Sequence, residues 1–180
     1  MDAKRVRFEA QVLPHLDAAY RYARWLAHSA SDADDLVQEA TLRAFRGFDD
    51  LRGTDARAWL LIIVRNCHLT ALRKRLKHPL VPLPEEHEGD GGALMSGAPD
   101  PQDAAIRRDD QRVLQRLLAA LPEDHREVLV LREIEDLDYR EIATVTSLPI
   151  GTVMSRLARA RAALRTQWQL EITGESRAMR

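Results

Sequence analysis

The chain has 180 residues, enough for one large or two small domains, and 45% of them are hydrophobic, so real cores can form. Charged residues make up 31% and aromatic residues only 5%, with a formal net charge of -1, a composition typical of well-solvated helices. A single cysteine excludes an intramolecular disulfide and a cysteine-based zinc site, and no apolar run approaches the ~18 residues that a membrane helix needs.

The near-zero net charge conceals a strong segregation of charge along the chain. Residues 57–78 carry six Lys or Arg and no acid, whereas residues 85–103 carry six acids and no Lys or Arg. Phosphates respond to such local patches, so a near-neutral chain can still bind nucleic acid. The first residues, MDAKRVRFEA, lack the apolar segment of a secretory signal. We therefore expect a cytoplasmic protein with no membrane insertion.

Apolar residues near the start recur at helical spacing and predict a helix from about His15 to His28. They are Leu13, Leu16, Tyr20, Ala23 and Leu26. A second helix is predicted to start at residues 31–34, where a serine and two acids suit the positive end of the helix dipole, and to stop near Gly47. Its outer face is acidic and polar, a pattern typical of a solvated helix surface. That face comprises Asp34, Asp35, Gln38 and Glu39.

A third helix is predicted from a cap at Thr54 to about Lys77. We expect it to bury Leu60, Val64, Cys67 and Ala71, with Trp59 and Ile63 alongside. Its outer face and last turns carry cations with no acid among them, which is the footprint of phosphate binding, although a helix C-terminus also tolerates cations. These cations are Arg57, Arg65, Arg73, Lys74, Arg75 and Lys77.

Residues 79–101 contain five of the eight prolines and four of the eight glycines, with no apolar period, so we predict a flexible, acidic linker there. About 25 residues reach at most ~80 Å when extended. That is enough to hold two DNA-binding modules about two turns of duplex apart, or ~70 Å. Beyond the linker, one helix is predicted through Ile106, Val113 and Leu121, and another after Pro122 through Ile134.

The most informative stretch is residues 138–165, DYREIATVTSLPIGTVMSRLARARAALR, which predicts a short helix, a break at Leu148 and Pro149, and a second helix. Asp138 can cap the first helix, with Glu141 as its capping-box partner. In the second helix Val153, Leu157, Ala160 and Leu164 form one apolar stripe. The opposite face is polar and basic, and consists of Thr152, Ser155, Arg156, Arg159, Arg161 and Arg165.

A short helix, a tight turn and a basic second helix are typical of a helix-turn-helix that reads DNA, against the alternative of a helical hairpin with a solvated arginine face. The expected fold class is all-α, with two small helical domains joined by a flexible acidic linker. The N-terminal three-to-four-helix domain would span residues 10–78 and the linker residues 79–104. The C-terminal four-helix domain would span residues 105–170, followed by a disordered tail, residues 171–180.

Four blocks of the chain, in order, resemble those of the extracytoplasmic-function sigma factors, a group of bacterial promoter-specificity subunits. They are DADDLVQEATLRAFR, DARAWLLIIVRNCHLTALRKR, LPEDHREVLVLREIEDLDYREIA and SLPIGTVMSRLARARAAL. The resemblance covers nearly the whole chain. It implies a protein that binds core RNA polymerase, recognises promoter DNA and melts it.

For the N-terminal domain, the resemblance implies binding to the melted minus-ten element. The loop from Phe48 to Arg57, with Trp59 and Asn66, matches positions that hold a flipped base, which needs an amide and an apolar or aromatic wall. Trp59 could equally be a core residue. The residues implied in contact with melted DNA are Trp59, Arg65, Asn66, Arg73, Lys74 and Arg75. The acidic face Asp34, Asp35, Gln38 and Glu39 matches the surface that docks on the polymerase clamp.

For the C-terminal domain, the resemblance implies reading of the minus-thirty-five element while the earlier helices rest on the polymerase flap. The implied DNA contacts are Arg140, Thr152, Ser155, Arg156 and Arg159. The chain departs from its relatives at Met154 and Ala158, where relatives often carry a basic residue at the first position. That departure leaves the promoter sequence open. An anti-sigma factor is a further expected partner.

Two other classes of function fit the sequence less well. A helix-turn-helix regulator acting without core polymerase would explain the C-terminal half but not the basic third helix, and a purely protein-binding adaptor would leave the cations without a role. An enzyme is disfavoured because the six histidines show no ligand spacing, there is no nucleotide-binding glycine pattern, and Cys67 lies on an apolar helix face. We expect no catalytic residue, cofactor or metal.

Overall fold

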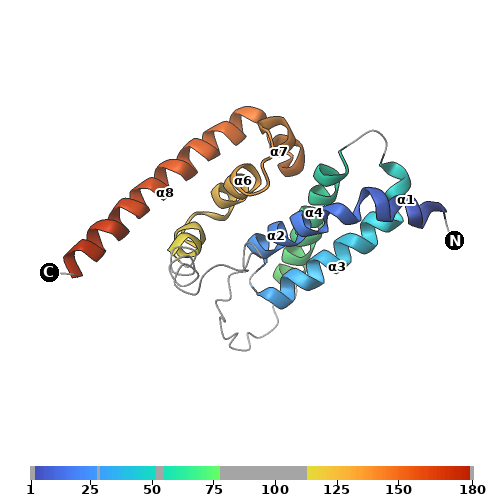
Figure 1. Cartoon of the computed structure of the whole chain (residues 1–180), viewed down its shortest axis with the longest axis horizontal. Helices are drawn as coiled ribbons and strands as arrows, with labels where there is room; N and C mark the ends of the chain where they lie inside the picture. Colours follow the sequence, from blue (N-terminus) through green and yellow to red (C-terminus); the bar gives the residue numbers. More distant parts are fainter. Residues whose placement is uncertain (1–2, 28, 52–54, 78–112, 179–180) are drawn as a thin grey trace, which may run out of the picture. The chain divides into compact units, whose positions relative to one another are not determined.

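The computed structural model describes residues 3–27, 29–51, 55–77 and 113–178. All regular structure in these ranges is helical, in an N-terminal and a C-terminal group of helices (Figure 1), which confirms the all-α class. The predicted acidic linker, residues 79–104, lies outside the described residues. So do the start of the predicted helix at Ile106 and the predicted cap at Thr54.

The N-terminal unit is built around three helices that each contact the other two, α2, α3 and α4. Its elements are α1 (Ala3–Gln11), the 3-10 turn η1 (Leu13–His15), α2 (Leu16–Leu26), α3 (Ala30–Arg46), the 3-10 turn η2 (Phe48–Asp50) and α4 (Ala56–Lys77). The sequence did not predict α1, because only Phe8 of its nine residues is buried and no apolar stripe marks it.

The buried face of α2 differs from the predicted stripe. Tyr20 is 39% exposed, whereas Tyr22 is fully buried. The predicted stripe is confirmed at Ala23 and Leu26 but was wrong at Tyr20. Helix α2 contacts both α3 and α4, so its buried face is wider than one row of residues. Its buried residues are Ala18, Ala19, Tyr22, Ala23 and Leu26.

Helix α3 begins earlier than predicted. The side chain of Ser29 is its cap, since Ser29 Oγ accepts a 3.0 Å hydrogen bond from the Asp32 backbone N–H, and Ser31 already lies inside the helix. At the other end the Gly47 N–H donates to the Arg43 carbonyl at 2.9 Å, so the predicted stop near Gly47 is confirmed.

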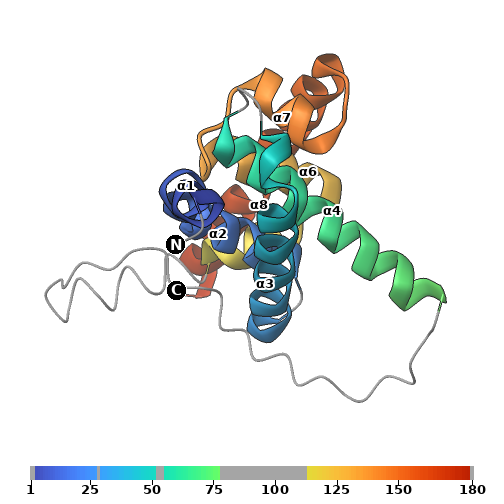
Figure 2. The same ribbon diagram turned by 90° about the vertical axis from the view of Figure 1, so that its right-hand side faces the viewer.

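Helix α4 buries a face wider than the one predicted, because it packs between α2 and α3. Leu61 and His68 are buried beside the expected residues, but Ala71 is exposed, so its predicted burial was wrong. The reason is visible in Figure 2, where the last turns of α4 extend beyond α2 and α3. The buried residues are Ala58, Leu60, Leu61, Val64, Cys67 and His68.

The C-terminal elements are residues 113–119, which are helical, α6 (Glu123–Glu133), α7 (Tyr139–Thr146) and α8 (Ile150–Ala178). Helix α6 packs on α8, and Val153, Leu157 and Ala160 of the predicted stripe are buried. Pro122 precedes α6, and its carbonyl accepts from the N–H groups of His125 and Arg126. Helix α8 continues to Ala178, through most of the segment predicted to lack structure.

The predicted break between α7 and α8 is confirmed at residues 147–149. Ser147 takes a left-handed conformation, with φ of 56°, and the Leu148 N–H donates to the Ala143 carbonyl at 3.0 Å. The Pro149 carbonyl then accepts from the N–H groups of Thr152 and Val153, which starts α8. A proline suits this position because it has no N–H to leave unsatisfied.

Spatial proximity divides the chain into two compact units, one around α1–α4 and the other around residues 113–119, α6 and α8, with residues 140–148 grouped with the first. Within the described ranges, no helix combines the length and apolar character that crossing a membrane requires.

Two leucines of α4 test this assignment of buried and exposed faces. Leu61 is fully buried, whereas Leu76 on the same helix is 83% exposed. We expect Leu61→Ala to lower the free energy of unfolding of the N-terminal unit by about 2–5 kcal/mol, because it leaves a cavity. Leu76→Ala should change it by less than about 0.5 kcal/mol. Urea unfolding followed by circular dichroism measures both, and equal losses would contradict the assigned faces.

Candidate nucleic-acid interface

Trp59, Asn66 and Arg73 lie on one face of α4. They are spaced seven residues apart, and seven residues make nearly two full helical turns, so each lies about 10 Å further along the same side. Trp59 is half-buried, while Asn66 and Arg73 are exposed. Along this face an aromatic surface is followed by an amide and then by a cation, which are the groups that an unstacked base and its phosphates require.

The cations of α4 are not all available to a ligand. Arg75 forms an ion pair with Asp32 of α3 at 2.8 Å, and Arg57 and Arg65 also have partners within the protein. Arg73, Lys74 and Lys77 are exposed and form no ion pair within the described ranges. The view of these six residues as uniformly unopposed was therefore wrong for Arg75, because its counter-charge comes from a different helix.

The acidic face of α3 contains Asp34, Asp35 and Gln38, all exposed, while Glu39 is half-buried. Glu39 accepts a 2.6 Å hydrogen bond from Arg43 one turn later, and this bond raises the pKa of Arg43. Three of the four predicted docking residues are therefore open to solvent, and the fourth is held by an ion pair within α3.

A cleft of about 260 Å³ lies between α3 and α4 beside this face. Asp35 and Glu39 line it from α3, and His68 and Arg75 line it from α4. From the sequence, Arg75 was assigned to melted DNA rather than to this cleft, and His68 was given no role. Their spacing of seven residues places both on one helix face. Cys67 also lines the cleft, and burial raises the pKa of its thiol, which agrees with its interpretation as a core residue rather than a nucleophile.

Two arginines of α8 are engaged by carboxylates of α6. Arg156 lies 3.0 Å from Asp124, and its side chain is only 23% exposed. Arg161 donates from Nε and Nη2 to the same oxygen of Glu133, at 3.1 and 2.7 Å, and these bonds raise the pKa of Arg161. Both arginines therefore join α8 to α6 within the C-terminal unit.

The other predicted contacts of the C-terminal helices are more accessible. Arg159 is exposed and forms no ion pair in the described part of the chain, and Arg140 is exposed on α7. Thr152 and Ser155 are half-buried, and the Ser155 hydroxyl donates to the Thr152 carbonyl at 3.0 Å. That leaves the hydroxyl oxygen of Ser155 free to accept. Met154 is 52% exposed.

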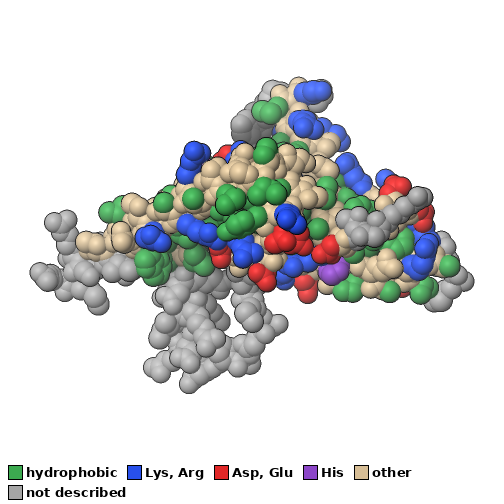
Figure 3. Space-filling view, turned by 90° about the horizontal axis from the view of Figure 1, so that it is seen from above, with side chains coloured by type: hydrophobic (Ala, Val, Ile, Leu, Met, Phe, Trp, Pro, Cys, Tyr) green, Lys and Arg blue, Asp and Glu red, His purple; other side chains and the backbone are tan. Residues whose placement is uncertain are grey.

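Charged side chains of both signs reach the surface. Figure 3 shows lysine and arginine in separate groups over the face in view, with acidic side chains between some of them. Among the described residues, no group of three or more His, Cys, Asp or Glu side chains is arranged to hold a metal ion.

Two family models match this chain. The model of sigma-70 region 2 matches residues 12–77, and the model of sigma-70 region 4 matches residues 111–164. The second match includes α7, so by sequence that helix belongs with α6 and α8.

Curated relatives agree with both matches. The RNA polymerase sigma-H factor of Pseudomonas aeruginosa is 36% identical over 141 residues, covering 76% of this chain and 73% of that protein. The ECF RNA polymerase sigma-E factor of Escherichia coli is 34% identical over 139 residues, covering 75% and 73%.

Solved structures show the same fold. The sigma factor RpoE of Bartonella quintana, crystallised with the anti-sigma factor NepR, matches with a TM-score of 0.70 and 29% identity over 91% of this chain and 97% of that one. CnrH in complex with the cytosolic domain of CnrY matches with a TM-score of 0.62 and 24% identity over 92% of this chain and 90% of that one, which supports the fold alone.

Proposed function

Because this chain belongs to the extracytoplasmic-function sigma factors, with sigma-70 regions 2 and 4, and directs promoter-specific transcription initiation by RNA polymerase, we propose how its surfaces divide that task. The family is non-enzymatic, and sigma factors bind core RNA polymerase and promoter DNA. A helix-turn-helix regulator acting without polymerase would not need region 2, which matches residues 12–77. We assign residues 10–78 to promoter melting, 105–170 to upstream recognition and 79–104 to their connection.

In our proposal α4 captures the melted minus-ten element. The observation that carries this role is the common face of Trp59, Asn66 and Arg73. A flipped base would lie between the indole of Trp59 and the amide of Asn66, and its neighbouring phosphates would meet the cations further along the helix. Arg73, Lys74 and Lys77 are the cations best placed for this, since they are exposed. Arg65 and Arg75 would contribute after exchanging their present partners for phosphates.

For the minus-thirty-five element, Arg159 is our leading candidate for a specific contact. It is exposed on the first half of α8 and, unlike Arg161, forms no ion pair within the described ranges. A bidentate arginine–guanine pair is the commonest specific base contact. Arg156 can reach DNA only by leaving Asp124, so its main part would be to orient α8. Thr152 and Ser155 would accept or donate at base edges or phosphates, and Arg140 would bind the backbone.

For the polymerase, the exposed carboxylates and amide of α3 would dock on the clamp, beside the cleft that α3 forms with α4. The family resemblance supports this role, as does the position of Asp35 at the edge of that cleft. The helices before α7 would rest on the flap. An anti-sigma factor is a further proposed partner, because the related Bartonella quintana protein was crystallised with one.

The base-capture role predicts a selective defect. Asn66→Ala should weaken binding of holoenzyme to single-stranded minus-ten DNA by about 0.5–1.5 kcal/mol, because one or two hydrogen bonds to the base are lost. Binding to duplex DNA should be unchanged. Permanganate reactivity of promoter thymines measures the same defect in open complexes. Leu76→Ala is the control, because Leu76 is exposed on α4 ten residues beyond Asn66 and has no polar group to bind a base. Reactivity of Asn66→Ala equal to this control would count against base capture.

The assignment of α8 predicts an order of effects at the upstream element. Arg159→Ala should cost about 1–3 kcal/mol of affinity for the cognate element and relax the preference at one base pair. Arg156→Ala should cost less, about 0–1 kcal/mol, because the residue serves mainly an internal ion pair. Footprint titrations with duplexes of varied sequence measure both losses of affinity. A larger loss in Arg156→Ala than in Arg159→Ala would reverse the roles assigned to the two arginines.

Docking through α3 can be tested by removing one carboxylate. Asp35→Ala should weaken binding to core polymerase by about 1 kcal/mol, with little change in unfolding, because the side chain is exposed. Asp17→Ala removes an exposed carboxylate from α2 and is the control. Fluorescence anisotropy of labelled protein with core enzyme provides the measurement. Equal affinities of the two variants would remove Asp35 from the interface.

A further inference from the structure

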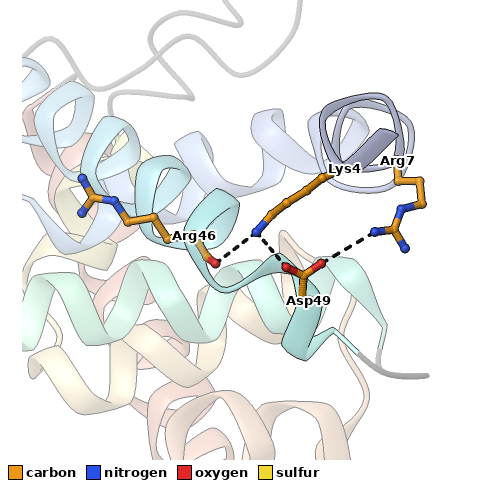
Figure 4. Close-up of polar contacts among 4 residues, drawn as sticks. All are labelled: Lys4, Arg7, Arg46 and Asp49. Carbon is orange, nitrogen blue, oxygen red and sulfur yellow. Dashed lines mark hydrogen bonds and ion pairs between the residues drawn. The ribbon is translucent and has the colours of Figure 1, made fainter. Parts of the chain in front are cut away.

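Met154, near the start of α8, exposes a large apolar side chain that no strong hydrogen bond or ion pair can hold. Charged side chains at the surface can be held by a neighbour. In the N-terminal unit, for example, Lys4 Nζ donates to Asp49 Oδ2 at 2.9 Å, and Arg7 Nη2 lies 3.6 Å from Asp49 Oδ1 (Figure 4). A thioether has no donor and is only a weak acceptor, so Met154 cannot be held in this way. It is 52% exposed, and its apolar surface meets water.

The position of Met154 is more informative than its exposure, because single apolar residues are common at protein surfaces. Ala158 is also exposed and follows Met154 by four residues, so the two lie side by side on α8. We call them the apolar pair. Ser155 and Arg159, which are proposed to contact DNA, each follow one member of the pair directly. The apolar pair therefore borders the surface proposed to read the upstream element.

The charge around the apolar pair favours DNA as its partner. Residues 150–170 of α8 carry four arginines and no acid. The match to sigma-70 region 4 extends to residue 164 and includes the pair, and sigma factors bind promoter DNA. An apolar groove of another protein would cover Met154 but would not need the surrounding cations. A DNA groove accounts for both, provided that its floor offers an apolar group.

The major groove offers one such group. Its base edges present hydrogen-bond donors and acceptors, and the methyl group of thymine is their apolar feature. An apolar side chain placed against any other base edge would remove polar groups from water without replacing their hydrogen bonds, which costs free energy. Against a thymine methyl, the same side chain buries apolar surface on both partners. Methionine suits this contact because its side chain is flexible and polarisable.

We propose that Met154, with Ala158 beside it, reads the methyl group of a thymine in the upstream element, while Arg159 contacts a neighbouring base. The inference rests on the proposed role of α8 in upstream recognition. It makes Met154 a specificity-determining residue, because the contact favours thymine without a hydrogen bond to the base. A basic residue at this position would instead favour guanine.

The test uses the full chain assembled with core polymerase and a promoter from which this holoenzyme initiates. Each thymine of the upstream element is replaced in turn by uracil, which lacks only the methyl group. We expect uracil at one or two positions to weaken promoter binding roughly two- to fivefold, because the apolar contact is lost. Met154→Ala should lose a similar factor on the unmodified promoter, and uracil at those positions should then have no further effect.

Two further variants complete the comparison. Leu170→Ala is the matched control, because Leu170 is 68% exposed on the same helix and lies about 24 Å further along it. It should bind as the unmodified chain does and keep the uracil effect. Met154→Leu should keep most of the preference for thymine, since leucine is also apolar.

Three results would overturn the proposal. The first is an upstream element in which uracil has no effect at any position, or which contains no thymine. The second is a uracil effect of equal size in Met154→Ala and the unmodified chain. The third is a Met154→Ala variant that binds core polymerase less tightly while its holoenzyme binds the promoter normally, because that result would assign Met154 to a protein contact.

Arg159→Ala, measured on the same promoter, separates this inference from the function on which it rests. If Arg159→Ala binds normally and uracil has no effect, the proposed role of α8 fails together with methyl reading. If Arg159→Ala is defective and uracil has no effect, α8 reads the upstream element and only the role of Met154 is rejected.

Discussion

Helix α4 must serve two surfaces at once, and this constraint organises the N-terminal unit. One side is buried against α2 and α3, with Leu60, Leu61 and Val64 free of solvent. The other side carries Trp59, Asn66 and Arg73 at intervals of two turns. Because a helix fixes the angle between its faces, the packing of the core also fixes the direction of the groups proposed to bind DNA. A rigid helix therefore provides precision that a loop could not.

Carboxylates of neighbouring helices form ion pairs with several arginines, and these pairs determine which cations remain available to a ligand. Asp32 engages Arg75, Asp124 engages Arg156 and Glu133 engages Arg161, in each case from a neighbouring helix. Exposed ion pairs of this kind contribute little to stability, and phosphates can compete for the arginines. These pairs have a larger effect on the direction of the arginine side chains, because each pair holds a long side chain along the protein surface. Arg73 and Arg159 form no such pair within the described ranges, and both are exposed to solvent.

Much of this organisation could be predicted from local sequence, and the failures have definite causes. The break at Pro149 follows from one residue's missing N–H and fixed φ, so it was predictable. The start of α3 was misplaced because Ser29 and Ser31 are equally good caps and only packing chooses between them. Tyr22 was missed because a helix between two neighbours buries more than one stripe. The ion pair of Asp32 with Arg75 joins residues far apart in sequence, so no local pattern reveals it.

The uninterrupted length of α8 has a mechanical consequence. Its 29 residues extend for about 43 Å, and a straight helix resists bending over that distance. A small tilt of the first turn, near Thr152, therefore becomes a displacement several times larger at Ala178. A spectroscopic label placed at that far end would therefore register a change in the angle of the helix without touching the residues proposed to read DNA.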